Sequence, residues 1–106
     1  MKRGAYINIP TPAGWTALIY ASSTGNLMLT KELLAKRADA NRAENDGWTP
    51  LHFSAHNGHK DIADLLLTNG ANVNYHNGEN KIPKDLARDA GFLDIVEMIP
   101  DVEQEF

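Results

Sequence analysis

The stretch GWTPLHFSAHNG, residues 47–58, contains the signals that begin and end one short helix. Thr49 is a good N-cap, because its hydroxyl can accept a hydrogen bond from an unpaired amide of the first turn. Pro50 suits the next position, where no amide partner is needed. Gly58 can adopt the left-handed conformation that commonly ends a helix. The stretch therefore predicts a helix from about Pro50 to Asn57.

A second short helix is predicted directly after this turn. Residues 61–69 carry apolar side chains at positions 62, 65, 66 and 67, and Gly70 follows as a helix end. The turn-forming pairs Asp46-Gly47 and Asn77-Gly78 predict hairpin-like loops before and after the two helices. Helices of about eight to ten residues are marginal in water. This helix pair must therefore be stabilised by packing on neighbours.

The same pattern recurs every 33 residues along the chain, without insertions. This shift places Gly14-Trp15-Thr16 on Gly47-Trp48-Thr49, and it aligns Leu33 with Leu66 and Ile99. The segment Gly4 to Asn8 also fits, as the end of an earlier repeat. A fixed period of this length is typical of repeat proteins whose units stack in a line. The prediction is a solenoid of stacked antiparallel helix pairs.

Residues 47–59 and 65–74 (GWTPLHFSAHNGH and LLLTNGANVN) closely resemble the ankyrin repeat, and the period of 33 agrees with that repeat's length. The resemblance covers roughly Gly14 to Ile99. It implies an all-α fold, a short ankyrin-repeat solenoid of antiparallel helix pairs joined by hairpin-like loops. We expect one domain, 1–106, divided into a partial N-terminal repeat 1–13, repeats 14–46 and 47–79, a capping repeat 80–100 and an acidic tail 101–106.

The outer repeats depart from the family pattern. Arg37 stands where the pattern has a helix-ending glycine, which would cost on the order of 1 kcal/mol if Arg37 is left-handed. Asn80 is a milder change, whereas Ile82 lacks the hydroxyl of a threonine cap. Lys84 and Arg88 make one face of the last repeat polar, as a terminal cap requires.

Composition excludes several functional classes. The chain has 10 Lys and Arg against 14 Asp and Glu, a net charge of -4, which gives no electrostatic reason to expect nucleic acid or membrane partners. It has no cysteine, and no run approaches the roughly 20 apolar residues of a membrane span. Residues 1–10 lack the apolar stretch of a signal peptide. We expect an intracellular, cytoplasmic protein.

Catalytic and metal-binding chemistry is not expected. His52 and His56 would share one helix face, as in some zinc sites, but no third ligand lies nearby in sequence. The family resemblance implies instead that His52 bonds the neighbouring backbone. Ser54, His52 and Asp46 do not form a plausible nucleophile, base and acid. No glycine-rich phosphate loop is present. We therefore predict no enzyme activity, no metal and no cofactor.

The resemblance implies that another protein is bound by the concave face of loop tips and first helices. Aligning the repeats with the family pattern places the predicted partner-binding residues on this face. They are Trp15, Ser23, Thr24, Asn45, Asp46, Trp48, His56, Asn57, Glu79, Lys81 and Asp89, beside Pro12, Ala13, Gly78 and Ala90. Trp15 and Trp48 have two readings, as binding anchors or as indoles packed on their own loops. Tyr20 and Phe53 are predicted to be core residues.

An alternative function is structural. The N-terminus looks cut, whereas the C-terminus looks natural, so the chain would be a fragment of a longer repeat array. The incomplete segment Gly4 to Asn8 would leave the first repeat thinly covered. Exposed apolar surface of this kind favours stacking on other repeats or self-association through the N-terminal end.

Overall fold

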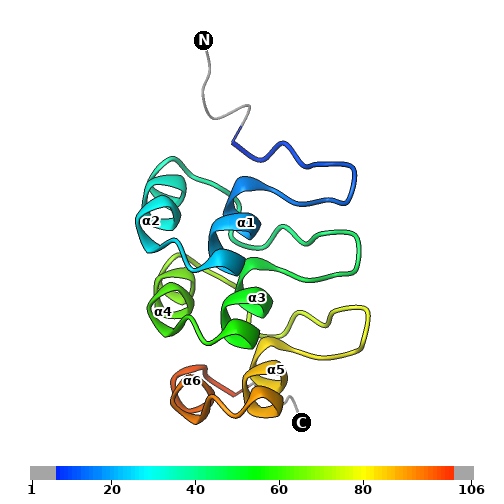
Figure 1. Ribbon diagram of the computed structural model, residues 1–106, viewed down its shortest axis with the longest axis vertical. Coiled ribbons are helices and arrows are strands. Elements are labelled where there is room, and N and C mark those ends of the chain that lie inside the picture. The colour runs from blue at the N-terminus through cyan, green and yellow to red at the C-terminus, as the bar shows by residue number, and fades with distance from the viewer. Residues whose placement is uncertain (1–6, 102–106) are drawn as a thin grey trace, which may run out of the picture.

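The computed structural model describes residues 7–101 of the chain, and this part is helical. Within it there are six α-helices and no strand (Figure 1). The first helices of the three pairs are α1 (Ala17–Thr24), α3 (Pro50–Asn57) and α5 (Pro83–Ala90). The second helices are α2 (Leu27–Ala35), α4 (Lys60–Thr68) and α6 (Leu93–Met98). The all-α class is confirmed, and α3 has the predicted bounds.

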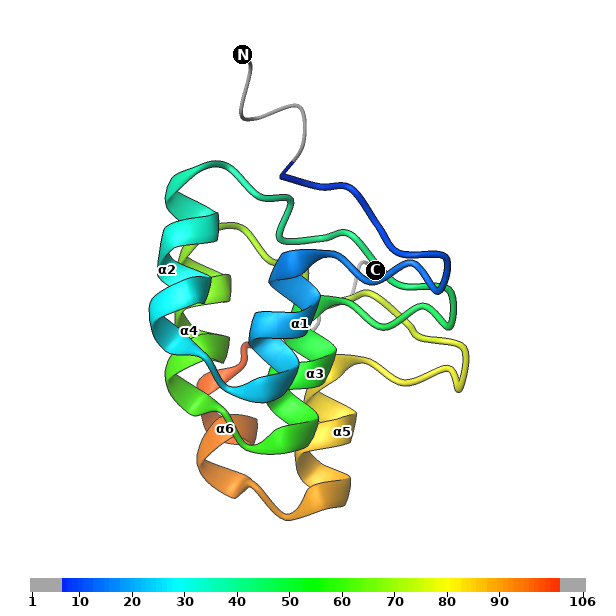
Figure 2. The same ribbon diagram turned by 45° about the horizontal axis from the view of Figure 1, so that its top comes forward.

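The helices form two layers. α1, α3 and α5 pack in succession, and α2, α4 and α6 pack beside them in the same order. The loops that precede α1, α3 and α5 project to one side of the first layer, one above another (Figure 2). The molecule is therefore elongated, with extents of 45 × 26 × 25 Å. This arrangement is the predicted stack of antiparallel helix pairs.

Threonine caps and glycine turns repeat along the stack. The Thr16 hydroxyl accepts a hydrogen bond from the Ile19 amide at 3.2 Å, and Thr49 accepts one from the His52 amide at 3.3 Å. Gly25 and Gly58 end the first helices at φ values of 84° and 79°. A Cβ atom at Gly25 would lie 2.6 Å from the His59 ring. Both the backbone conformation and the close approach of the next repeat therefore favour glycine there.

The predicted irregularities of the outer repeats are present. Arg37 and Asn80 have φ values of 69° and 62°, so both residues are left-handed. Ile82 provides no side-chain cap to α5, as expected. The Asp85 carboxylate partly compensates by accepting the Ile82 amide hydrogen bond at 3.1 Å. The helix ends therefore keep the repeat geometry even where the residue present departs from the family pattern.

The core lies between the two layers. Its fully buried side chains include Leu18, Leu51, Ile62, Leu66, Ile95 and Ile99. The prediction that Tyr20 and Phe53 are core residues is wrong. Tyr20 is 59% exposed, and Phe53 is only partly buried and belongs to neither core cluster.

Helix geometry explains this error. Residues of a helix are offset by about 100° each, so Phe53 lies about 200° around α3 from the buried Leu51. Leu51, Ser54 and Ala55 define the buried side of α3. Phe53 therefore shares the opposite side with the exposed His56 and Asn57.

The described segment before the first loop makes a hydrogen bond that its equivalent one repeat later also makes. The Asn8 side-chain oxygen accepts a hydrogen bond from the Asp39 amide at 2.8 Å. One period later, the Asn41 oxygen accepts one from the Asn72 amide at 2.7 Å. Gly4 and Ala5 of the proposed half-repeat, and residues 102–106 of the acidic tail, lie outside the described residues.

Candidate interaction surface

Three loops of identical geometry form the edge of the first layer. Each loop is closed by the same backbone hydrogen bond, which joins residues four apart in the sequence. The amides of Thr11, Glu44 and Asn77 donate to the carbonyl groups of Trp15, Trp48 and Lys81 at 2.8, 2.9 and 2.9 Å. These residues are spaced by the repeat length. The hairpin-like loops predicted from Asp46-Gly47 and Asn77-Gly78 are therefore present, and each holds the residue before its helix in one position.

The loop tips also bond to one another. The Asn45 amide donates to the Ala13 carbonyl at 3.0 Å, and the Gly78 amide donates to the Asp46 carbonyl at 2.7 Å. The Asn45 side chain adds a bond to the Pro12 carbonyl at 2.9 Å. The three tips are thus linked into one edge. We call the surface formed by this edge and by α1, α3 and α5 the loop face.

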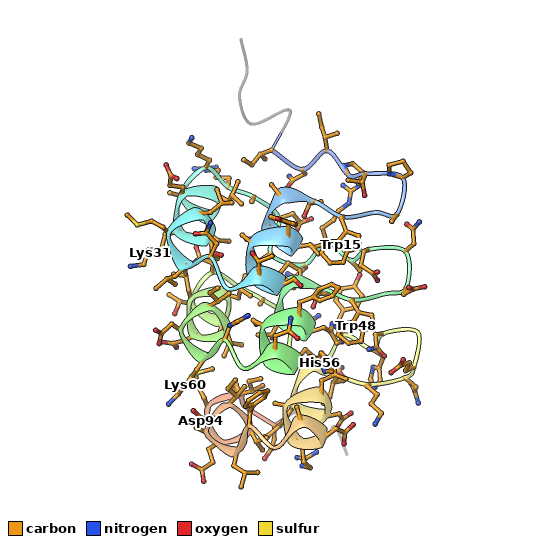
Figure 3. All side chains as sticks on the ribbon, in the orientation of Figure 1. Trp15, Lys31, Trp48, His56, Lys60 and Asp94 are labelled. Atoms are coloured by element: carbon orange, nitrogen blue, oxygen red, sulfur yellow. The ribbon has the colours of Figure 1, made fainter. Side chains whose placement is uncertain are left out.

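Four aromatic side chains lie in contact along the loop face. The Phe53 ring packs between two indoles, with ring centroids 4.8 Å from Trp15 and 4.9 Å from Trp48. His56 meets Trp48 edge-on, with centroids 5.3 Å apart and an angle of 89°. Figure 3 shows Trp15, Trp48 and His56 on the loop side of the first helices. We call Trp15, Phe53, Trp48 and His56 the aromatic row.

The aromatic row joins two repeats. Trp15 belongs to the loop before α1, whereas Phe53 and His56 belong to α3 and Trp48 to the loop before it. Trp15, Phe53 and Trp48 are partly buried, and His56 is exposed. Both indoles therefore pack against side chains of α3. Edge-to-face and tilted contacts of this kind stabilise aromatic pairs and leave ring edges and faces accessible.

An ion pair takes the place of the aromatic pair in the third repeat. One period after Trp48 and His56, the chain has Lys81 and Asp89. The Lys81 ammonium pairs with the Asp89 carboxylate, and both side chains are substantially exposed. The hydrogen bond that Lys81 donates to Asp89, followed by the charge of that carboxylate, raises the pKa of Lys81. The loop face thus changes from aromatic to charged toward the C-terminal end.

The remaining predicted residues occupy the two margins of the loop face. Asn45, Asp46 and Glu79 are exposed at the loop tips. Ser23, Thr24 and Asn57 lie at the far ends of α1 and α3. There the Asn57 side chain donates to the Ser23 carbonyl at 2.9 Å, and the Thr24 hydroxyl bonds to the Tyr20 carbonyl at 2.9 Å. Among the predicted aromatic residues, Trp48 contacts His56 directly and is linked to Trp15 through Phe53.

His52 has a structural position beneath this surface. Its side chain is fully buried. Its Nδ1 accepts a hydrogen bond from the Thr49 amide at 3.0 Å, and its Nε2 donates to the Lys81 carbonyl at 2.9 Å. Burial lowers the pKa of His52, which favours the neutral ring that this pattern requires. His52 therefore bonds the neighbouring backbone, as the resemblance implied, and connects α3 to the third loop.

The histidines and the serine considered above do not form a metal or nucleophile site in the part of the chain that the structure describes. Within residues 7–101, no group of three or more His, Asp or Glu side chains is placed to hold a metal ion. The Ser54 hydroxyl donates to the Leu51 carbonyl at 3.2 Å within its own helix. No helix in this described part is long and apolar enough to cross a membrane.

Two hollows lie elsewhere on the molecule. One of about 320 Å³ lies at the turns between first and second helices and is lined by Gly25, Leu27 and residues 58–62. Another of about 270 Å³ lies between α2 and α4, and Leu27, Lys31, Asp61 and Leu65 are among its lining residues. Neither includes a member of the aromatic row.

Stacked helix pairs with linked loop tips define a helical repeat protein that presents one continuous face. A family model described as ankyrin repeats (three copies) matches residues 1–77 of the chain. The chain belongs to the ankyrin repeat family. Ankyrin repeats are generally protein–protein interaction modules, and the family is typically non-enzymatic. No curated protein matches the chain.

Sequence reasoning missed two residues of this surface. Phe53 lies at the centre of the aromatic row, and Tyr20 occupies the equivalent position on α1, where it is exposed. Both were assigned to the core because their place on the first helix matches a core leucine of the ankyrin repeat. The burial of Leu51, Ser54 and Ala55 places Phe53 outward, but the two turns of α3 are too short for the sequence pattern alone to show it.

Proposed function

We propose that this chain binds another protein through the loop face, with the aromatic row as the centre of contact. The single observation that supports this is the contact of Trp15, Phe53, Trp48 and His56 across two repeats. Aromatic residues dominate the energetics of protein interfaces, because a large ring gains contact area while losing few rotamers. Their packing holds the rings in place before binding, which lowers the entropic cost of association.

The backbone of the loop face supports the same proposal. Bonds between adjacent loop tips, from Asn45 to Ala13 and from Gly78 to Asp46, fix the edge of the surface. Interface backbones of rigid binders move little on binding. The predicted residues Asn45, Asp46 and Glu79 then form the polar margin on one side, with Ser23, Thr24 and Asn57 on the other. A polar rim around an apolar centre is the usual anatomy of such an interface.

Photo-crosslinking in cells of the native source tests which face is used. A photo-reactive residue is placed at Tyr20 or His56 on the loop face, and at Met28 or Lys31 on α2 as matched exposed controls. We expect the two loop-face positions to capture one common partner that the α2 positions do not capture. Capture from α2 alone would contradict the proposal.

Affinity for the purified partner gives a second test. Tyr20 and His56 are exposed, so their truncation should leave the fold intact. We expect the double variant Tyr20→Ala and His56→Ala to bind about tenfold more weakly. The control variant Met28→Ala and Leu93→Ala, which removes two exposed residues of the second layer, should bind as the unchanged chain does. Equal losses in both double variants would contradict the proposal.

Self-association through the N-terminal end is the second candidate function. Ile9, which precedes the first loop, is 57% exposed and therefore offers apolar surface there. Light scattering coupled to size-exclusion chromatography tests it. A dimer that forms with rising concentration, and that Ile9→Ser weakens, would support self-association. A monomer at all concentrations would remove this candidate and leave the loop face as the interaction surface.

A further inference from the structure

Charge is distributed unevenly on the loop face. The segment 10–24, which contains the first loop and α1, has no charged residue. The segment 43–57, with the second loop and α3, has Glu44 and Asp46 but neither Lys nor Arg. The corresponding segment of the third repeat, 76–90, contains three acids and three bases. Within these three segments, Lys and Arg are therefore confined to the third repeat.

Those three bases are already neutralised by neighbours. Lys81 pairs with Asp89, Lys84 with Asp101 and Arg88 with Asp85. Glu44, Asp46 and Glu79 take part in none of the ion pairs found among residues 7–101. The charge that the loop face offers to a partner is thus negative, and it comes from the loop tips.

The three acids differ in their availability. Glu44 is partly buried, and its Oε1 accepts hydrogen bonds from the amides of Asp46 and Trp48 at 2.8 and 2.9 Å. Its role is to hold the loop that carries Trp48. Asp46 and Glu79 are exposed and lie at equivalent places in adjacent loops, one repeat apart. Asp46 stands two residues before Trp48, and Glu79 stands two residues before Lys81, the residue that replaces Trp48 in the third repeat.

Exposed carboxylates beside partly exposed indoles favour one kind of group. The face of an indole attracts cations, and a guanidinium stacks on it while keeping its N–H groups free for a carboxylate. An anionic group on the partner would instead meet like charge at the tips. The open shape of the loop face, linked along three parallel loops, suits an extended segment that runs along the stack.

We propose that the loop face receives an extended basic peptide segment, in which Arg or Lys side chains lie on the aromatic row and pair with Asp46 and Glu79. This inference rests on the proposed function, because it names the chemistry of the partner at the same surface. It goes further in requiring a positive, unfolded segment rather than a protein surface of any charge.

Synthetic peptides test the inference without the natural partner. Three pools of ten-residue peptides are used. In each pool, all positions except two carry random neutral residues other than tryptophan. The two fixed positions, about 10 Å apart in an extended chain, carry Arg, Glu or Gln in the respective pools. Trp15 and Trp48 are the two tryptophans of the chain, so quenching of its intrinsic fluorescence reports binding at the aromatic row. Anisotropy of fluorescein-labelled peptides gives the affinity.

A matched pair of variants separates local from global charge. Asp46→Asn with Glu79→Gln removes the two loop-tip charges. Asp64→Asn with Glu97→Gln removes two exposed charges from α4 and α6 and changes the net charge equally. We expect the Arg pool to bind tightest and to weaken several-fold between about 0.05 M and about 0.5 M NaCl. The loop-tip variant should bind it about fivefold more weakly, and the control variant should bind as the unchanged chain does.

Three outcomes would overturn the inference. Preference for the Glu or Gln pool would reject a basic partner and leave the proposed function standing. Equal weakening in both double variants would show that the net charge of the chain, and not the loop tips, attracts the peptide. Absence of binding by any pool, while crosslinking from His56 still captures a partner, would show that the loop face binds a folded surface. Failure of the crosslinking as well would reject the proposed function itself.

Discussion

Phe53 is the residue on which the loop face most depends. Its ring contacts both Trp15 and Trp48, so it joins the first repeat to the second on the outer side of α3. Its equivalent on α1, Tyr20, is 59% exposed. Two aromatic side chains at the same repeat position therefore differ in role, because only Phe53 has an indole on each side.

This difference predicts unequal effects of truncation. Phe53→Ala removes two aromatic contacts and should lower the free energy of unfolding by about 2 kcal/mol. Tyr20→Ala, the matched control, should lower it by less than about 0.5 kcal/mol. Urea denaturation measures both. A loss of similar size in the two variants would show that the contacts of Phe53 with the indoles contribute little.

His52 predicts a pH dependence of stability. Burial lowers its pKa below the ordinary value of 6.5, so the unfolded chain binds this proton more readily than the folded chain. The stabilisation is complete above about pH 6.5 and is lost as pH falls toward the lowered pKa. The slope from this group is at most about 1.4 kcal/mol per pH unit.

Denaturation at a series of pH values checks this prediction. We expect His52→Gln to be less stable at neutral pH, because it loses the paired bonds to Thr49 and Lys81. Its stability should also fall less steeply below pH 6.5 than that of the unchanged chain. If the free energy of unfolding falls equally steeply with pH in both proteins, the pH dependence comes from groups other than His52.

At the scale of elements, helix ends were the features that sequence predicted best. The bounds of α3 follow from Thr49, Pro50 and Gly58, whose roles depend on their own backbone chemistry. The left-handed conformations of Arg37 and Asn80 were predictable for a different reason, because register alone aligns them with glycines at turn positions. Local signals are sufficient where the cause is local.

The side on which each helix is buried was predicted less well. The first helices have eight residues, about two turns, so their apolar pattern is too short to separate an inner aromatic ring from an outer one. Phe53 was misplaced for this reason. The contacts of the aromatic row also join different repeats, and no pattern within one repeat contains that information. Stacking geometry was needed to find it.

Arg37 gives a prediction about a helix end. It is exposed and has a φ of 69°, a conformation that glycine adopts without steric cost. Arg37→Gly should raise the free energy of unfolding by about 1 kcal/mol. Asn80→Gly should give a smaller gain, since asparagine tolerates this conformation better. Urea denaturation again measures the change, and a loss of stability on Arg37→Gly would contradict the assigned strain.

At the scale of the whole molecule, stability is shared between neighbouring pairs. α3 contacts both α1 and α5, whereas α6 lies at the end of the second layer and contacts only α4 and α5 extensively. Each pair buries its apolar side against the next, so coupling runs from neighbour to neighbour along the stack. The position of a truncation in the stack should therefore determine how much of the molecule it unfolds.

Two buried truncations test this coupling. Leu66→Ala in α4 should cost about 3 kcal/mol and leave one unfolding transition, seen equally by tryptophan fluorescence and circular dichroism. Ile95→Ala in α6 should cause the third helix pair, α5 and α6, to unfold before the first two. Its circular dichroism transition should then precede its fluorescence transition, because both tryptophans lie in the first two repeats. Coincident transitions in Ile95→Ala would contradict the expected independence of the end.

The central claim is that another protein binds on the loop face. Hydrogen–deuterium exchange of the chain, with and without a partner isolated by the unmodified chain, tests this claim most directly. We predict that the partner slows exchange in the three loops and in α1, α3 and α5, with the largest change around Trp48 and Phe53. Slowed exchange confined to α2, α4 and α6 would contradict it.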